Sequence, residues 1–380
     1  MKYRKPDYYD TFVCIADRCP ATCCQGWQIA IDDETLKAYW NLQGSFANRL
    51  KNSVDWEYGV FCQYQGKCEL LNERNLCDLY ENLGEAYLCD ACREYPRHVE
   101  EFENVREYSL SLSCPEAARI LLTQEGRAQF IEWETEEEEQ FEEGFDSQLY
   151  GVLLQARQIM CDILMSHRQP FAVSMELVQM LAENLQGLLD EGQLALADTV
   201  LGRFQPMEEQ EQKEAARRAR IRRSRRWDTC GEELKLLRTL PHTDPTWMEI
   251  LDWMENERER LGRDGWEALH GALESGRGCG NGMPADRMQW EEKAARLAVS
   301  FLYTYFCGAV YDGQMAAACR FAVFCADWIL ELAAAQWQRQ GRKERPDVVT
   351  AAWRFSREME HRDENREALQ EYLEKRGRKV

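Results

Sequence analysis

The chain has 380 residues, of which 44% are hydrophobic, and its net charge is −20. At roughly 150 residues per domain it is long enough for two or three domains, and this composition excludes a disordered or fibrous protein. The acidic balance disfavours general affinity for nucleic acid, because phosphate binding needs a basic face, and it suits a lysine-rich partner.

Neither the start of the chain nor its longest apolar run predicts a membrane protein. Residues 1–6 carry charge but no apolar stretch typical of a secretory signal. The longest apolar run, residues 297–311, is shorter than the roughly 20 residues that cross a bilayer. We therefore expect a soluble, cytoplasmic protein without a membrane partner.

Ten of the sixteen cysteines precede residue 115. In a reducing compartment such cysteines are ligands or buried thiols more often than disulfides. Cys14, Cys19, Cys23 and Cys24 lie within eleven residues. Thiolates are soft ligands that select zinc, copper(I) or iron–sulfur clusters. The adjacent pair could face one polynuclear centre or two neighbouring ions, so we expect a folding unit built around metal.

The first third of the chain predicts loops with short regular elements. Residues 26–31 alternate enough for a short strand, and carboxylates at 32–34 begin a helix that ends near residue 42. Residues 56–78 indicate loops with a β-ribbon, and residues 78–91 one helix. A hairpin is expected from strands at 99–102 and 107–112, followed by a helix from about residue 114 to 126.

Residues 132–143 are almost all carboxylate, which is typical of a solvated connector. We therefore expect a mainly α protein in three parts. Residues 1–130 form a cysteine-rich metal- or cluster-binding domain of loops and helices with a small β-hairpin. Residues 131–147 form the acidic connector, and residues 148–380 form a helical domain.

The helical part begins with an apolar stripe of 3.6-residue period from residue 149 to 164. Further helices are expected at about 173–189 and 194–204, and the arginine-rich run at 217–226 continues a carboxylate-rich helix. The glycine-rich residues 275–284 predict a flexible connector, since no strand precedes them as a dinucleotide fold requires. Long aromatic-containing helices at 286–311 and 314–339 should form the core, and a charged helix follows from residue 348.

Eight cysteines exceed the four ligands that one structural zinc ion or one four-iron cluster takes. Two zinc ions fit this number, and so does one cluster with spare thiols. The bland alternative is a centre that only staples a small, loop-rich domain. The eight are Cys14, Cys19, Cys23, Cys24, Cys68, Cys77, Cys92 and Cys114.

A second constellation lies at residues 354–365. On one continuous helix, Arg357, His361 and Glu364 would share a face. A histidine flanked by carboxylates could carry a proton or orient a reacting group. The alternative is a solvated ladder of salt bridges, which contributes little. We expect this segment instead to fold back against the cysteine domain or the aromatic helices.

Six stretches of the chain form a recognisable set. They are residues 19–29 (Cys-Pro-Ala-Thr-Cys-Cys-Gln-Gly-Trp-Gln-Ile), 76–79 (Leu-Cys-Asp-Leu), 83–85 (Leu-Gly-Glu), 92–97 (Cys-Arg-Glu-Tyr-Pro-Arg), 113–116 (Ser-Cys-Pro-Glu) and 356–361 (Ser-Arg-Glu-Met-Glu-His). Together they resemble the FliB family of flagellin lysine-N-methylases. The resemblance covers the N-terminal third closely and returns near the C-terminus; Cys62 and Cys89 fall outside its pattern.

The resemblance implies methyl transfer from S-adenosylmethionine to lysine side chains of flagellin or another lysine-rich protein. It also implies a cysteine-bound iron–sulfur (4Fe–4S) cluster, with zinc as the alternative. The eight cysteines match the family pattern, and which four of them are ligands stays open. The chain has no strand, glycine-rich turn and helix of the usual methyltransferase kind, so the nucleotide site would be unconventional. The competing hypothesis is a non-catalytic metal-chelating or redox-sensing module whose helical half binds a partner.

A lysine must lose a proton, from a reference pKa of about 10.4, before its nitrogen attacks a methyl group. A carboxylate or tyrosine could accept that proton, directly or through water, and aromatic walls would favour a sulfonium cation. The candidate catalytic residues are Glu358, Glu360, His361, Tyr303 and Tyr305. The candidate cofactor-binding residues, which lie in the resembling stretches, are Trp27, Arg97 and Arg357.

Overall fold

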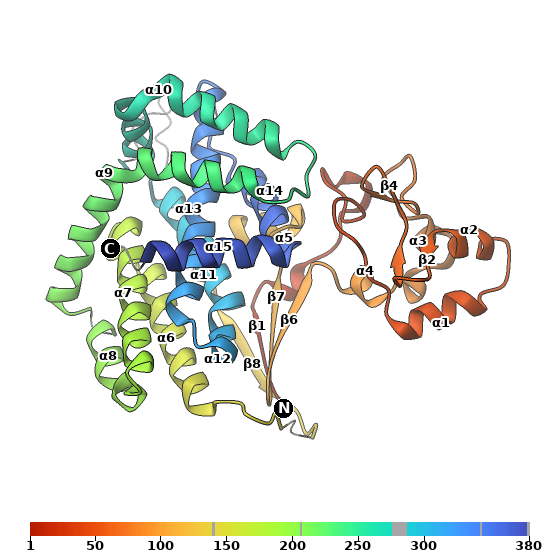
Figure 1. Ribbon diagram of the computed structural model, residues 1–380, viewed down its shortest axis with the longest axis horizontal. Helices are drawn as coiled ribbons and strands as arrows, with labels where there is room; N and C mark the ends of the chain where they lie inside the picture. Colours follow the sequence, from red (N-terminus) through yellow and green to blue (C-terminus); the bar gives the residue numbers. More distant parts are fainter. Residues whose placement is uncertain (139–140, 206, 276–286, 343, 378–380) are drawn as a thin grey trace.

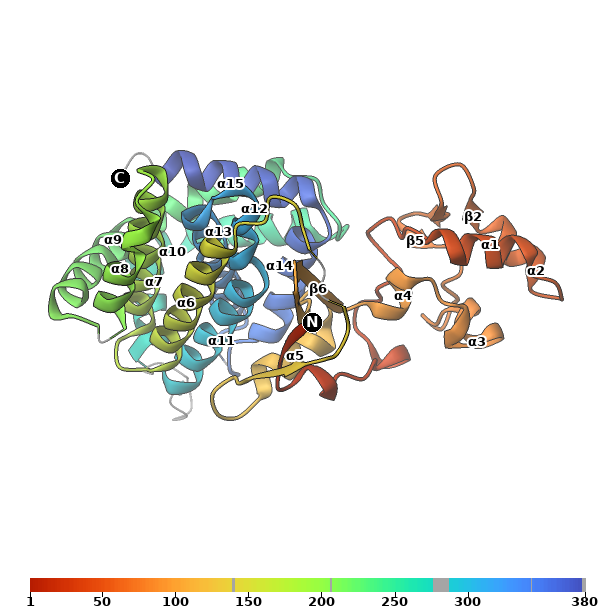
Figure 2. The same ribbon diagram turned by 90° about the horizontal axis from the view of Figure 1, so that it is seen from below.

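Helices make up most of the computed structural model, which describes residues 1–138, 141–205, 207–275, 287–342 and 344–377. They form a large body, and residues 24–92 form a small lobe that stands to one side of it (Figures 1 and 2). The mainly α fold class is confirmed. Most of the predicted glycine-rich connector at 275–284 lies outside the described residues, and no helix within them is long and apolar enough to cross a membrane.

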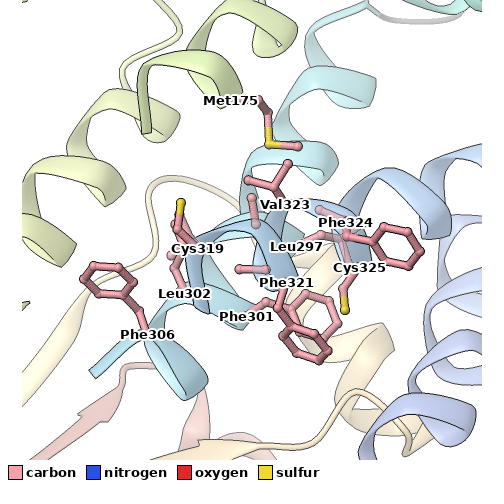
Figure 3. Packing of buried hydrophobic residues seen from close by; sticks show 14 of the residues in the cluster. Met175, Leu297, Phe301, Leu302, Phe306, Cys319, Phe321, Val323, Phe324 and Cys325 are labelled. Carbon is pink, nitrogen blue, oxygen red and sulfur yellow. The ribbon is translucent and has the colours of Figure 1, made fainter. Parts of the chain in front are cut away.

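The helices of the body surround α13. That helix buries twenty of its 25 residues, and a helix that is apolar all round belongs in the middle of a core. Phe301 and Leu302 of α11 pack with Phe321 and Phe324 of α13, as predicted for the aromatic helices (Figure 3). The body helices are α5 (Pro115–Thr123), α6 (Ser147–Met165), α7 (Phe171–Asp190), α8 (Ala197–Phe204), α9 (Glu209–Thr239), α10 (Trp247–Ser275), α11 (Arg287–Tyr305), α12 (Ala309–Asp312), α13 (Met315–Arg339), α14 (Val348–Glu360) and α15 (Asp363–Gly377).

The arginine-rich run of α9 turns two of its side chains toward the body. Arg222 pairs with Asp327, and the Arg226 guanidinium lies 2.5 Å from a carboxylate oxygen of Glu331, which is buried on α13. Charged groups at such depth require partners, so these arginines stabilise the α9–α13 contact. They are not part of an open basic face.

A four-stranded sheet, with strand order β6-β7-β1-β8, covers one side of the body. The strands are β1 (Lys2–Pro6), β6 (Arg97–Phe102), β7 (Val105–Leu110) and β8 (Phe130–Glu134). β6 and β7 form the predicted hairpin with Phe102 opposite Val105, while β1 runs parallel to β7 and antiparallel to β8. Successive side chains of a strand point to opposite faces, so neighbouring residues of β6 have different surroundings.

Strand β8 includes the first four residues of the expected acidic connector at 131–147, and three of these four are exposed. Residues 130–134 alternate apolar and acidic side chains, which suits an edge strand. Lys2 and Arg4 on the neighbouring β1 pair with Glu134 and Glu132, which offsets the repulsion between the carboxylates. α6 then begins at Ser147, where the Asp146 carboxylate caps it by accepting from the backbone of Leu149.

The small lobe has its own core of ten buried residues, two of which are Cys68 and Cys89. A single bridge between Ala30 and Val60 replaces the strand expected at 26–31. The helix expected at 78–91 is split because Gly84 has φ of +84°. The lobe elements are α1 (Asp33–Asn41), α2 (Ala47–Asn52), β2 (Val54–Asp55), β3 (Val60–Phe61), β4 (Gln63–Tyr64), β5 (Lys67–Cys68), α3 (Asp78–Leu83) and α4 (Asp90–Glu94).

The flanks of the lobe belong to the body. Tyr8, Phe12 and Cys114 are buried in the same core as the long helices, and Tyr95 packs against it. The predicted cysteine-rich domain, residues 1–130, is therefore made of two parts in the structure. One part packs on the helices, and the other is the small lobe.

Candidate functional site

A cavity of about 740 Å³ lies where the small lobe meets the junction of α14 and α15. One wall comes from the lobe and the other from four consecutive residues of the body. The lining residues are Gly26, Trp27, Gln28, Asp55, Val60, Phe61, Cys62, Gln63, His361, Arg362, Asp363 and Glu364.

Gly26 allows the lobe to approach the body closely. It has φ of +93°, and a Cβ atom at this position would lie 2.7 Å from both Cγ2 and the carbonyl oxygen of Thr243. Any other residue would be strained and would clash there. The short strands β2 and β3 then present Asp55 and Val60 to the cavity.

On the body side, the chain breaks its helix at His361, and α15 begins at Asp363. The Asn365 side chain stabilises this corner by donating to the carbonyl oxygens of Glu358 (2.6 Å) and Pro241 (2.9 Å). The prediction of one continuous helix is wrong at this point, because Asn365 satisfies a carbonyl that the break leaves free. His361 and Glu364 nevertheless both line the cavity.

His361 stacks on Trp27 with ring centroids 5.1 Å apart and planes 8° from parallel. Tyr95 lies against both rings, at 5.6 Å from His361 and 5.9 Å from Trp27. Burial, and then the positive charge of Arg357, lower the pKa of His361 to about 3. The imidazole is therefore neutral at physiological pH, and a flat aromatic cluster joins the lobe to the body beside the cavity.

Arg357 connects the tail to the cysteine loop. Its buried guanidinium donates to the carbonyl oxygens of Ala21 (2.9 Å), Thr22 (2.7 Å) and Ser113 (3.2 Å). Trp27 adds a bond from Nε1 to the carbonyl of Cys23 at 2.7 Å. The expectation that the tail folds back against the cysteine domain is confirmed, and the solvated ladder is excluded because Ser356, Arg357 and Glu358 are buried.

Glu358 serves the body. Its carboxylate accepts from the backbone N–H groups of Thr243 (2.8 Å) and Asp244 (2.7 Å), which fixes the loop that meets Gly26. Burial raises the pKa of Glu358 to about 7, against the lowering effect of these two bonds. Its geometry is that of a carboxylate that positions a loop.

Glu360 ends a chain of hydroxyl groups. Ser111 donates to its carboxylate, Ser111 and Ser113 lie 2.5 Å apart, and Ser113 lies 3.0 Å from the Tyr95 hydroxyl. Burial raises the pKa of Glu360 to about 7, although the bond from Ser111 opposes the shift. The chain therefore links the aromatic cluster to a carboxyl group that can take up a proton near neutral pH.

The structure separates the two tyrosine candidates. Tyr305 lies near Glu360, whose charge adds to burial in raising the Tyr305 pKa. Tyr303 lies elsewhere, stacked on Phe130 at 4.4 Å beneath the sheet. Arg97 does not line the cavity. Its guanidinium lies over the ring of Phe12, while the next residue of β6, His98, points to the other face of the strand and meets Tyr305.

The eight predicted cysteine ligands fall into two neighbouring groups. The first group is Cys14, Cys19, Cys23 and Cys114. Burial raises the pKa of Cys114, and the charges of Cys19 and Cys14 raise it further. The charges of Cys14 and Cys114 also act on the Cys23 thiol. The second group is Cys24, Cys68, Cys77 and Cys92, joined by Cys89, which the sequence pattern omitted. The groups meet at Cys23 and Cys24, whose side chains are hydrogen-bonded.

The donor chemistry of these groups fits a soft metal. In the described part of the chain, however, no three His, Cys, Asp or Glu side chains are placed so that they could hold a metal ion. The cysteines that the structure describes are also free of disulfides. The side chains thus gather in one region without forming a closed site, and no chemical step is assigned to a metal.

Several residues that line the cavity were not predicted from the sequence as site residues. Asp55 and Gln63 lie in the two-residue strands β2 and β4, which no sequence pattern marks as functional. Their role depends on a contact with a segment about 300 residues away. Arg362 and Asp363 lie within residues 354–365, and the charged pattern of that segment is the sequence feature that pointed to this wall of the cavity. Arg362 donates to the His242 carbonyl (3.2 Å), so it also fixes the body wall.

Comparison with known proteins matches most of this body to one family. The family described as FliB lysine N-methylase C-terminal domain matches residues 157–379. Over 127 residues, which are 31% of this chain, it is 29% identical to the flagellar biosynthetic protein FliU of Salmonella muenchen and covers 75% of that protein. The lysine-N-methylases of Salmonella typhimurium and Salmonella choleraesuis give the same identity, but the match spans about a third of their length (32%). No solved structure matches the chain.

Proposed function

Since this chain belongs to the FliB lysine N-methylase family, we propose that it transfers a methyl group from S-adenosylmethionine to lysine side chains of flagellin. Relatives named lysine-N-methylase and a relative named for flagellar biosynthesis support the reaction class and its context. The whole reaction is proposed for this chain, because the match to the lysine-N-methylases covers a third of their length.

The cavity between the lobe and the α14–α15 corner is the observation that carries the proposal. Its lining combines two acidic residues, Asp363 and Glu364, with two aromatic residues, Trp27 and Phe61. Carboxylates attract a lysine ammonium, and aromatic rings favour a sulfonium cation. A volume of about 740 Å³ is within the usual range for small-molecule sites.

The reaction requires one proton transfer and one methyl transfer. The lysine ammonium loses a proton, and the free electron pair on its nitrogen forms a bond to the methyl carbon. The carbon–sulfur bond breaks with its electron pair returning to sulfur, which leaves a neutral thioether. We assign the proton to Glu360 through the hydroxyls of Tyr95, Ser113 and Ser111, because these groups form a continuous hydrogen-bonded chain.

We propose that the two cysteine groups hold an iron–sulfur cluster, with zinc as the alternative. The gathering of the eight thiols around Cys23 and Cys24 supports this assignment. When bound, the centre would cross-link the lobe, whose own core is small. Its role is structural: it would keep Trp27 and Asp55 opposite the α14–α15 corner.

The test begins with anaerobically purified protein, metal analysis and a visible spectrum. Purified flagellin and S-adenosylmethionine are then added, and mass spectrometry locates methylated lysines. The Asp363→Asn/Glu364→Gln double variant should raise KM for flagellin about tenfold or more, since paired charges at such sites contribute about 1–3 kcal/mol. Asp162→Asn, which changes an exposed carboxylate of α6, is the matched control.

Ser111→Ala should lower kcat with little change in KM, because it interrupts the proton path and leaves the cavity wall intact. Methylation by the wild type with unchanged kinetics in both variants would contradict the assigned site. A wild type that binds metal but neither S-adenosylmethionine nor flagellin would instead be a chelating or redox-sensing module.

A further inference from the structure

Exposed aromatic side chains gather on the small lobe. Of the eight large aromatic side chains that are exposed in the described residues, six lie within residues 24–92. The body is much larger, so size does not explain this distribution. Trp and Tyr exposed together are typical of protein-recognition surfaces, where they supply large contact area at low entropy cost. The six are Trp40, Trp56, Tyr58, Tyr64, Tyr80 and Tyr87.

Two of them, Trp40 and Trp56, are in contact, and Tyr58 follows Trp56 in the same turn; we name these three residues the aromatic rim. Trp40 of α1 meets Trp56 edge-on, with ring centroids 5.2 Å apart and planes at 82°. Trp56 is fixed by a bond from Nε1 to the Lys51 carbonyl at 2.9 Å. The three side chains are nevertheless 63%, 37% and 71% exposed. The two tryptophan side chains of the rim are thus held in place before any partner binds.

The rim is continuous with the cavity through the turn between β2 and β3. Asp55, which lines the cavity, closes this turn by accepting from the N–H groups of Glu57 (3.0 Å) and Tyr58 (3.2 Å). The same turn therefore places Asp55 at the cavity and Tyr58 at the surface. The rim is therefore only a few residues along the chain from a residue that lines the cavity.

The charge of the lobe indicates the kind of partner. Residues 24–92 carry eleven carboxylates against five lysines and arginines, within a protein of net charge −20. Such a surface attracts a basic partner and repels an acidic one. Trp and Tyr faces also accept lysine and arginine side chains through cation–π contacts.

We propose that the aromatic rim docks the lysine-bearing protein, so that one lysine enters the cavity while neighbouring residues of the same protein cover Trp40, Trp56 and Tyr58. This inference rests on the proposed function, because it names the surface that recognises the methylated protein. The helical body then provides the α14–α15 corner of the cavity, and the small lobe determines which protein is methylated.

The test compares a Trp56→Ala/Tyr58→Ser variant with the wild type on two substrates, purified flagellin and a short lysine peptide. The variant should raise KM for flagellin about tenfold, as expected for exposed aromatic anchors, and leave the peptide kinetics unchanged. Phe141→Ala, at an aromatic side chain that is 88% exposed and lies outside the lobe, is the matched control and should change neither KM. Metal content and melting temperature verify that the variant lobe is folded.

Unchanged KM for flagellin would overturn the proposal. So would an equal loss on both substrates, because the residues would then shape the cavity. A change of oligomeric state in the variant, measured by analytical ultracentrifugation, would show that the rim joins two copies of this chain instead. If the wild type methylates neither substrate, the proposed function fails separately. The dissociation constants of wild type and variant for flagellin then decide the docking proposal.

Discussion

The body and the small lobe achieve their structures in different ways. The body buries a continuous set of large apolar side chains around α13, whereas the lobe has ten buried residues, two of them cysteines. A core of that size rarely holds loops in place, so the lobe depends on its thiols and on its contacts with the body. One wall of the cavity therefore belongs to the body, which is stabilised by its own core. The other belongs to the lobe, which depends on its thiols and on the body to stay folded.

The largest effect should follow from Cys24→Ala, because Cys24 lies where the two cysteine groups meet. We expect loss of bound metal together with loss of the folded lobe, while the helical body retains its circular dichroism. Metal analysis and calorimetry measure the two outcomes. Cys319→Ala, at a buried thiol of α13, is the control and should keep its metal. Wild-type metal content and lobe stability in Cys24→Ala would contradict the view that the lobe, unlike the body, depends on its thiols.

The converse change is Phe321→Ala in the body. This ring is fully packed on α13, so its removal should cost about 3–5 kcal/mol of unfolding free energy. Denaturant unfolding measures this cost. Metal content should stay at the wild-type value, because Phe321 belongs to the core of the body and not to that of the lobe. A loss of metal in this variant would mean that lobe and body unfold as one unit.

The sequence predicted those features that depend on neighbouring residues, and it did not predict those that depend on contacts between distant residues. The aromatic helices, the hairpin and the gathering of the cysteines depend on local patterns, and these were visible. The cavity was not visible, because Asp55 and Glu364 come together through contacts between distant segments, such as Gly26 with Thr243 and Trp27 with His361. The break at His361 also depends on a distant partner, since Asn365 bonds to Pro241 as well as to Glu358.

The joint between the regions is tested by Arg357→Ala. The variant leaves the carbonyls of Ala21, Thr22 and Ser113 without their charged donor, which should cost about 3 kcal/mol. The lobe should also become more sensitive to protease, because the segment that joins it to the body is released. Arg354→Ala on the same helix is the control, since its guanidinium is more exposed. Equal stability of the two variants would mean that Arg357 does not hold the joint.

A smaller effect concerns pH. Burial raises the pKa of Glu360 from an ordinary value near 4.5 to about 7 in the folded chain. The protonated form therefore stabilises the fold, fully below about pH 4.5, and this contribution is lost as the pH rises through 7. Glu360→Gln should lose less stability than the wild type as the pH rises through this range, by roughly 3 kcal/mol. Parallel curves of unfolding free energy against pH would contradict the shift.

The central claim is that ligands bind between the two regions, and hydrogen–deuterium exchange tests it most directly. Wild-type protein is compared with and without saturating S-adenosylmethionine and a lysine peptide. We predict that exchange slows together in residues 26–28, in residues 55–63 and in residues 361–364, because both walls of the cavity contact the ligands. Protection confined to the helical body, with the lobe exchanging as before, would contradict the claim.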